Sequence, residues 1–132
     1  MKIHVVSAVI VLDSRVLLGL RSASKTSFPG AWDFLGGHVE ANETPSEAVV
    51  RECLEEAGII IEEFYEYPTM CILEDMILHC FLVTRFSGLP MNTAPDEHDH
   101  LAWFTFAEAR KLKLAIPEML EEIMAHQKMA GD

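Results

Sequence analysis

The stretch from Gly36 to Ile59, GGHVEANETPSEAVVRECLEEAGI, combines six glutamates with a single arginine. Residues three and four apart share one face of a helix, so Glu52, Glu55 and Glu56 are expected to converge on one side. Like charges at these spacings destabilise a bare helix. The pattern therefore indicates either a solvated acidic face or a site that holds divalent cations.

The positive charge available within this stretch is small. Arg51 can bond Glu55 one helical turn later, but one guanidinium cannot neutralise the helical glutamates together with the nearby Glu40 and Glu43. Clustered carboxylate oxygens suit Mg²⁺ or Mn²⁺, which prefer hard oxygen ligands. A divalent metal site is thus predicted, while the spacing alone leaves the solvated acidic face open.

A helix that could position these glutamates is marked at both ends. Thr44 can cap its N-terminus, Pro45 suits its first turn, and Glu47 completes a Thr-x-x-Glu capping box. Gly58 suits the left-handed position that ends a helix. The apolar residues expected to face the core from this helix are Val49, Cys53 and Leu54.

Runs rich in β-branched and aromatic residues surround this helix in the sequence and predict strands. The predicted strands cover 3–12, 15–20, 59–67, 69–86 and 101–106, with an extended segment at 32–37 and a hairpin bend near 73–75. A final helix opened by Pro117 carries Met119, Leu120, Ile123 and Met124 on one face. This order predicts an α/β fold in the α+β sense, with helices packed on a mixed sheet.

Length and composition limit the class of protein. At 132 residues the chain can close one hydrophobic core without disulfides, so a single domain over 1–132 is expected. The net charge of −11 disfavours a nucleic-acid polymer as partner. Without a bilayer-length apolar run or a signal peptide, a cytoplasmic protein with no membrane partner is the default. Cys53, Cys71 and Cys80 lack CxxC spacing and are expected to be reduced core thiols.

The acidic stretch resembles the Nudix box, G-x5-E-x7-R-E-U-x-E-E-x-G-U, in which U is a bulky apolar residue. The residues that match it are Gly37, Glu43, Arg51, Glu52, Cys53, Glu55, Glu56, Gly58 and Ile59. Cys53 is smaller than the usual residue at its position, and Leu35 stands where many members have proline. A chance match at so many fixed positions is improbable, so the chain is identified as similar to the small, MutT-like Nudix hydrolases.

This resemblance implies a Nudix-like mixed β-sheet sandwiched by helices. It also implies an enzyme that hydrolyses the diphosphate bond of a nucleoside diphosphate linked to another moiety. The implied cofactor is Mg²⁺ or Mn²⁺, which lowers the pKa of a bound water. The residues implied as ligands are Gly37, Glu52, Glu55 and Glu56, with Arg51 orienting them and with Glu43 and Gly58 supporting the site.

The general base is left open between the box and a later loop. Glu52 is one choice, and the other is a carboxylate of the PDEHDH loop, with Glu97 preferred over Asp96. The alternative for Glu97 is a plain surface loop residue. His98 and His100 in the same loop are expected to be solvent-exposed, because hard metal ions favour oxygen donors.

Contacts to a substrate are predicted outside the box. Arg21 and Lys25 are candidates for phosphate binding, as scarce positive charges near the Gly-Gly turn, with simple surface charge as the alternative. His38 is expected to line the rim of the site or to be structural. The aromatic residues that could stack on a base, or pack in the core instead, are Phe28, Trp32 and Trp103.

The identity of the substrate depends on loops outside the box. A nucleoside triphosphate or a modified, oxidised nucleotide is the first choice. The alternatives are ADP-ribose, a nucleotide sugar or a dinucleoside polyphosphate. A non-catalytic nucleotide-binding module is a further alternative, although the intact box glutamates favour an enzyme. A homodimer is left open.

Overall fold

The computed structural model describes residues 2–68 and 71–129, without the side chains of 71–73 and 127–129. Its elements are β1 (Ile3–Leu12), β2 (Arg15–Arg21), β3 (Trp32–Asp33), β4 (Leu35–His38), α1 (Pro45–Ala57), β5 (Ile60–Glu66), β6 (Cys71–Leu73), β7 (Met76–Ser87), β8 (His98–Thr105), α2 (Phe106–Ala109) and α3 (Pro117–Met129). This order agrees with the predicted one. The predicted strand start at Thr69 and the predicted burial of the Cys71 side chain lie outside the described residues.

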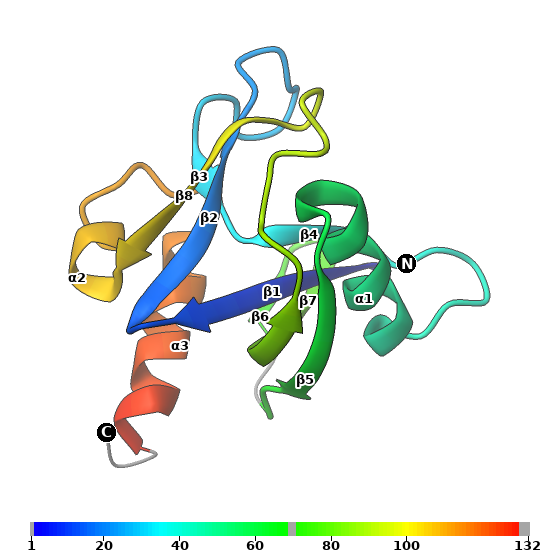
Figure 1. Ribbon diagram of the computed structural model, residues 1–132. Coiled ribbons are helices and arrows are strands. Elements are labelled where there is room, and N and C mark those ends of the chain that lie inside the picture. The colour runs from blue at the N-terminus through cyan, green and yellow to red at the C-terminus, as the bar shows by residue number, and fades with distance from the viewer. Residues whose placement is uncertain (1, 69–70, 130–132) are drawn as a thin grey trace.

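Strand β1 joins the parts of the sheet. Its residues 3–10 pair in parallel with β7, residues 5–8 pair antiparallel with β4, and residues 11–12 pair with β2. Strand β7 also pairs with β5 and β6, and β2 also pairs with β3 and β8. Parallel and antiparallel pairs therefore share one mixed sheet, as predicted (Figure 1).

The β1–β2 hairpin closes with a two-residue turn. Both turn residues have positive φ, 52° at Asp13 and 63° at Ser14. Such angles match the right-handed twist of the flanking strands. Asp13 and Ser14 therefore form a tight turn between β1 and β2.

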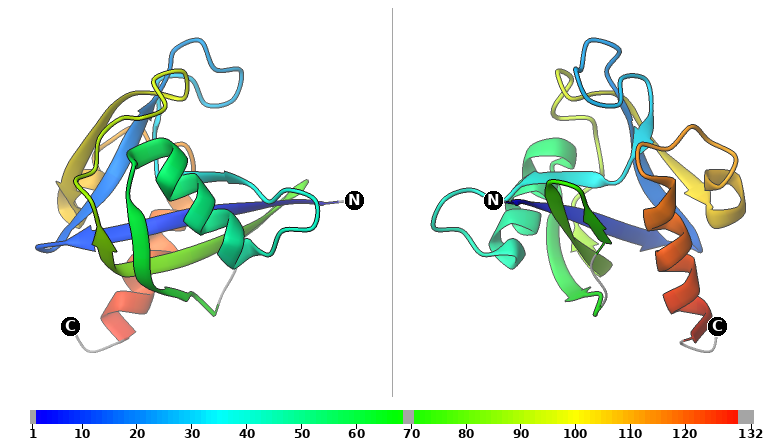
Figure 2. Two further views of the ribbon diagram at one scale, coloured as in Figure 1. Left: turned by 45° about the vertical axis from the view of Figure 1, so that its right-hand side comes forward. Right: turned by 180° about the vertical axis from the view of Figure 1, so that it is seen from behind.

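Helices α1 and α3 cover opposite faces of the sheet, as the two views of Figure 2 show. Along β1, Val6, Ala8 and Ile10 belong to the core cluster that includes α1, while Val9 belongs to the cluster that includes α3. Alternate residues of a strand point to opposite faces. Strand β1 is therefore buried on both sides, which explains its nearly unbroken apolar sequence.

Helix α1 has both of its predicted caps. The Thr44 side chain accepts a hydrogen bond from the Glu47 N–H, and the Glu47 side chain accepts one from the Thr44 N–H. At the other end, Gly58 has a φ of 66° and its N–H donates to the Leu54 carbonyl. These bonds satisfy polar groups that a helix end leaves unpaired.

The prediction that Leu54 faces the core is wrong. Its side chain is 52% exposed. The arc of α1 that packs on the sheet runs instead through Ala48, Val49, Cys53 and Ala57, which are fully buried. Leu54 lies outside that arc because each helical residue advances by about 100° around the axis.

Strand β8 begins at His98, earlier than the predicted start at 101. His98 pairs with Arg21 of β2, across an irregularity between Leu20 and Arg21. The pairing with β2 extends the strand into a polar segment that resembles a loop in sequence. His98, Asp99 and His100 are consequently strand residues.

Cys53 and Cys80 are buried, as predicted. Burial raises the pKa of the Cys53 thiol to about 12, which makes its thiolate scarce at neutral pH. Across residues 2–68 and 71–129, no helix is long and apolar enough to cross a membrane.

Candidate metal centre

The backbone of β4 lies directly against the glutamates of α1. A Cβ at Gly37 would collide with the Glu52 carboxylate, and a Cβ at Gly36 would collide with the Val6 carbonyl. The Gly36 N–H donates a hydrogen bond to Glu56 Oε1 at 3.1 Å. Glycine is needed at position 36 because the Val6 backbone approaches so closely, whereas a side chain at position 37 would displace the Glu52 carboxylate. The predicted sharp turn at Gly36 and Gly37 is wrong, because both residues lie in strand β4 and pair with β1. It is this strand that brings the chain into contact with two box glutamates.

Arg51 holds the acidic side chains together. Its Nε donates to Glu43 Oε2 at 2.7 Å, and its Nη2 donates at 3.0 Å to Glu43 Oε1 and to the His38 carbonyl. Its Nη1 lies 3.3 Å from Glu55 Oε2 and 3.6 Å from Glu52 Oε2. The hydrogen bond from Arg51 lowers the pKa of Glu43 to about 2. The predicted contact between Arg51 and Glu55 is confirmed.

Two of the box glutamates are buried. Glu52 is 9% exposed and Glu56 is 5% exposed, whereas Glu55 is open to solvent. Burial, and next the charge of Glu52, raise the pKa of Glu56 to about 9. Burial also raises the pKa of Glu52, although the charge of Arg51 acts in the opposite direction. Buried carboxylates of this kind are stabilised in their charged form by a cation beside them.

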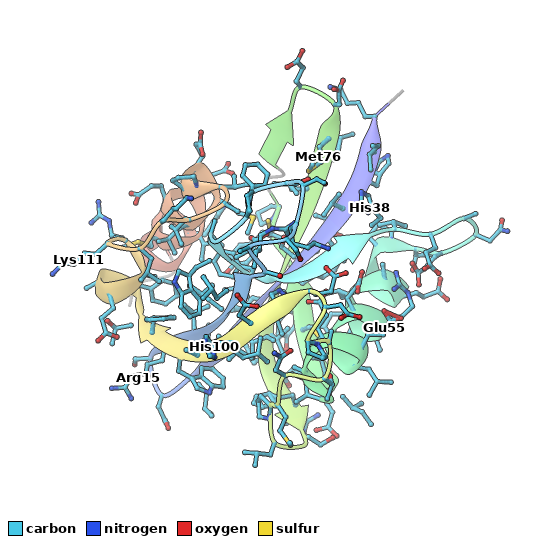
Figure 3. The ribbon with its side chains drawn as sticks, turned by 90° about the horizontal axis from the view of Figure 1, so that it is seen from above. Arg15, His38, Glu55, Met76, His100 and Lys111 are labelled. Carbon is cyan, nitrogen blue, oxygen red and sulfur yellow. The ribbon has the colours of Figure 1, made fainter. Side chains whose placement is uncertain are left out.

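A cavity of about 540 Å³ lies beside these glutamates and is called the acidic cavity below. The predicted residues that line it are Arg21, Lys25, Gly37, His38, Arg51, Glu52, Glu55, Glu56 and Glu97. Figure 3 shows the labelled Glu55 and His38 on one side of the molecule, away from Arg15 and Lys111. The structure therefore gathers residues of the box and of two distant loops around one volume.

Among the predicted ligands, general bases and supporting residues, Glu43, Gly58 and Asp96 do not belong to the lining of the acidic cavity. Glu43 bonds Arg51 at the edge of the site. Gly58 ends α1. Asp96 is exposed, so Glu97 is the better placed of the two loop carboxylates.

Of the cationic residues outside the box, Arg21 ends β2 and Lys25 lies on the loop that follows it. Lys25 Nζ lies 2.8 Å from Glu97 Oε2, and this hydrogen bond lowers the pKa of Glu97. Arg21 Nε donates to the Ser27 carbonyl at 2.9 Å, and Arg21 Nη1 lies 3.9 Å from Asp33 Oδ2. Glu97 therefore lines the acidic cavity and is paired with Lys25.

The expectation that His98 is solvent-exposed is wrong. His98 is 4% exposed, and its ring occupies the space that a side chain at Gly19 would fill. Burial lowers the pKa of His98. Among the described residues, its Nδ1 has no hydrogen-bond partner. His100 is exposed, as predicted. The glycine at position 19 of β2 is the sequence signal that could have indicated a buried neighbour.

A second cavity of about 170 Å³ adjoins the acidic cavity. The residues that line both are Arg21, Ser27, Gly36, Gly37, His38, Glu56 and Glu97. The residues that belong to the second cavity alone include Phe28, Asp33, Phe34, Met76, Leu78 and His98. Asp33 was not predicted as a site residue, because it lies in a two-residue strand and belongs to no sequence motif. Burial raises the pKa of the Asp33 carboxyl to about 6, against the opposing charge of Arg21.

Phe28 lines this second cavity, whereas Trp32 and Trp103 pack against the core clusters. Trp32 meets Phe104 edge to face, with ring centroids 4.9 Å apart. The prediction that the two tryptophans pack in the core is therefore confirmed. Phe28 keeps its side chain available to a ligand.

The donor set of the acidic cavity fits a hard divalent cation. Its lining has the carboxylates of Glu40, Glu52, Glu55, Glu56 and Glu97 against three cationic side chains. In the described part of the chain, no three His, Cys, Asp or Glu side chains are already arranged to hold a metal ion. Mg²⁺ commonly takes one or two protein carboxylates and completes its shell with water and substrate phosphates. The buried pair of Glu52 and Glu56 beside an open cavity suits that mode.

Known proteins resemble this chain over most of its length. A family model described as NUDIX domain matches residues 2–126. CTP pyrophosphohydrolase of Escherichia coli (strain K12) is 36% identical over 129 residues, covering 93% of this chain and 92% of the relative. The 8-oxo-dGTP diphosphatase of Proteus vulgaris is 32% identical over 107 residues, covering 81% of this chain and 78% of the relative. A crystal structure of a MutT NUDIX hydrolase from Burkholderia pseudomallei matches with a TM-score of 0.82 and 29% identity, covering 92% of this chain and 97% of that chain.

Proposed function

The chain belongs to the Nudix family as a MutT-like pyrophosphohydrolase, and from this premise we propose that it is a metal-dependent enzyme acting on a nucleoside triphosphate or a modified nucleotide. The reaction is hydrolysis of a diphosphate bond, which releases two phosphate-ended products. Residues 1–132 form a single catalytic domain in this proposal. The observation that carries it is the buried pair of Glu52 and Glu56, which faces a cavity also lined by Arg21 and Lys25.

The residues that would hold Mg²⁺ or Mn²⁺ are Glu52, Glu55 and Glu56, with the Gly37 carbonyl. A bound divalent ion neutralises pyrophosphate charge and lowers the pKa of a coordinated water. Arg51 positions Glu52 and Glu55 through its Nη1, at 3.6 Å and 3.3 Å. Glu43 fixes the arginine in turn through two hydrogen bonds.

Of the two candidates for the general base, Glu52 is favoured. Burial raises the pKa of Glu52, which makes its carboxylate the stronger proton acceptor. The hydrogen bond from Lys25 lowers the pKa of Glu97, which makes that carboxylate a weaker one. Glu52 would therefore take the proton of the attacking water, and Glu97 would act as a further carboxylate of the cavity.

A nucleoside substrate is supported by the second cavity and by the relatives. Its lining by Phe28, Phe34, Met76 and Leu78 offers apolar surface for a base, directly beside the cavity proposed to hold the phosphates. The named activities of the two curated relatives are a CTP pyrophosphohydrolase and an 8-oxo-dGTP diphosphatase. Both names describe nucleoside triphosphates, so this class is preferred over ADP-ribose, nucleotide sugars and dinucleoside polyphosphates.

The test is a product-release assay across nucleoside triphosphates, oxidised nucleotides, ADP-ribose and nucleotide sugars, with Mg²⁺ or Mn²⁺ and with chelator. We expect turnover of a nucleoside triphosphate class that chelator abolishes. Preferred turnover of ADP-ribose or a nucleotide sugar would overturn the substrate class. Tight nucleotide binding without turnover of any compound would favour a non-catalytic module instead.

A further inference from the structure

An ion pair connects two loops that are far apart in the sequence. Lys25 Nζ and Glu97 Oε2 lie 2.8 Å apart, although the residues are separated by 72 positions. The Ser22 N–H also donates to the Glu97 carbonyl at 3.1 Å. Figure 1 shows the loop after β2 and the loop before β8 meeting at the same end of the molecule. The ion pair therefore fastens the two loops where they meet.

Both partners of the ion pair also line the acidic cavity with Glu52 and Glu56. The Glu97 carboxylate is close enough to Glu52 and Glu56 for its charge to act on both. Glu97 thus lies between two kinds of positive charge. One is the Lys25 ammonium that it already binds, and the other is any divalent cation held by the buried glutamates.

These two positive charges compete for one carboxylate. An ammonium at 2.8 Å from Glu97 repels a divalent cation that enters the same cavity, and Glu97 cannot satisfy both equally. Lys25 has a flexible four-carbon stem and is 27% exposed, so it can change partner without moving the backbone. A phosphate group in the acidic cavity would offer it a new anion.

We propose that Lys25 is an exchangeable counter-ion of Glu97. Without substrate it neutralises Glu97 and opposes metal binding, and with substrate it moves to a phosphate oxygen and releases Glu97 toward the cation. The inference rests on the proposed metal-dependent function. Its consequence is that the metal and the substrate each strengthen binding of the other.

The experiment measures Mn²⁺ binding to the full chain without nucleotide, by the paramagnetic resonance signal of free Mn²⁺. Lys25→Met removes the competing charge, so the Mn²⁺ dissociation constant is expected to fall by about threefold, the scale of a partly exposed ion pair. Lys25→Arg keeps the charge and should leave the Mn²⁺ dissociation constant measured without nucleotide nearly unchanged. Lys111→Met, on the far side of the molecule in Figure 3, controls for the change in net charge.

A double-mutant cycle separates the specific pair from a general field effect. In the Glu97→Gln background, Lys25→Met should no longer tighten Mn²⁺ binding. For the nucleotide that the enzyme turns over best, Lys25→Met should instead raise KM by a similar factor while kcat changes less. Tighter metal binding and weaker substrate binding from one substitution is a combination that a merely structural role would not produce.

The outcomes distinguish the inference from the function on which it rests. Unchanged Mn²⁺ affinity in Lys25→Met, or equal tightening in the Glu97→Gln background, would overturn the exchange and leave the metal-dependent function standing. Failure of the unmodified protein to bind Mn²⁺ would overturn both. A thermal melt of each variant verifies that it is folded.

Discussion

The acidic cavity has two walls that are built in different ways. The box wall, residues 36–58, is held by contacts between residues close in sequence, such as the bonds from Arg51 to Glu43 and to the His38 carbonyl. The loop wall, residues 21–30 and 88–97, is held by the Lys25–Glu97 pair across 72 positions. The box wall thus presents its carboxylates from a capped helix, while the loop wall depends on how two connections meet.

This difference in construction suggests different roles for the two walls. The box wall buries two of its carboxylates and positions them by an arginine network. The loop wall carries cationic side chains with long stems that keep partial exposure. We infer that the box wall sets the chemistry and that the loop wall adapts to the substrate.

The largest expected effect is on kcat. It compares two single substitutions, one that removes a carboxylate from the box wall and one that removes a carboxylate from the loop wall. Glu52→Gln removes a proposed metal ligand that is also the proposed base, so kcat should fall by about a thousandfold. Glu97→Gln should reduce kcat by about tenfold to a hundredfold, because it removes a further carboxylate of the acidic cavity and leaves the proposed base in place. Steady-state kinetics measures both. Equal losses would break the distinction between the walls.

The second prediction concerns the close approach within the box wall. Gly37→Ala places a methyl group into the Glu52 carboxylate and should lower kcat/KM by about a hundredfold, the effect of a small displacement of a catalytic group. Gly58→Ala is the matched control. Because Gly58 has a φ of 66°, alanine at this position should lower the free energy of unfolding by about 1 kcal/mol. A Gly37→Ala enzyme with unaltered kcat/KM would show that Glu52 can move without harm.

The third prediction concerns the stability of the metal-free protein. Burial raises the pKa of Glu56 from 4.5 to about 9. Between these pH values the folded protein keeps a proton that the unfolded chain has lost, so the free energy of unfolding falls as pH rises. The melting temperature in chelator should decrease from about pH 5 to about pH 8, and Glu56→Gln should flatten the decrease. A profile that Glu56→Gln leaves unchanged would contradict this assignment.

The loop wall should respond to pH with the opposite sign. The pKa of Glu97 is lowered by Lys25, so its contribution to stability is present above its ordinary pKa and is lost as pH falls. Lys25→Met should remove this loss of stability at acid pH. It should leave in place the decrease in melting temperature that accompanies rising pH. Melting curves extended below pH 4.5, the ordinary pKa of the Glu97 carboxyl, measure the loop wall, and those from about pH 5 to about pH 8 measure the box wall.

The smallest expected effect compares the two cations. Arg51→Lys loses the paired hydrogen bonds to Glu43 and should lower the free energy of unfolding by about 1–2 kcal/mol. Lys25→Arg preserves a single ion pair and should change the free energy of unfolding by less than about 0.5 kcal/mol. Chemical denaturation measures both values. The reverse order would mean that the loop wall is the more tightly held.

Most of the box wall could be predicted from the sequence, since its determinants are local. Thr44, Glu47 and Gly58 mark the ends of α1 by residue type alone, and all three act as expected. The contact between Arg51 and Glu55 follows from helical spacing. The exposure of Leu54 could not be predicted in the same way, because the buried arc of α1 includes Glu52 and Glu56, which no hydrophobic pattern selects.

The loop wall and its surroundings were less predictable, since they depend on pairing between distant strands. His98 is buried because β8 extends along β2 as far as Arg21. Asp33 enters the second cavity from a strand of two residues that pairs with Gly19 and Leu20. Neither position shows a local sequence signal for burial, so the contacts of Arg21, Asp33 and His98 required the structure.

The position of β1 in the sheet has a consequence for biosynthesis. Its parallel partner β7 follows α1 in the chain, so a ribosome completes the entire acidic helix before the strand that pairs with residues 3–10 exists. Until β7 emerges, the sheet that buries one face of α1 is incomplete, and a nascent chain would carry all the box glutamates without the enclosure that raises the pKa of Glu56. Chains truncated before Met76 should therefore be rapidly digested by protease, whereas the full chain should resist it.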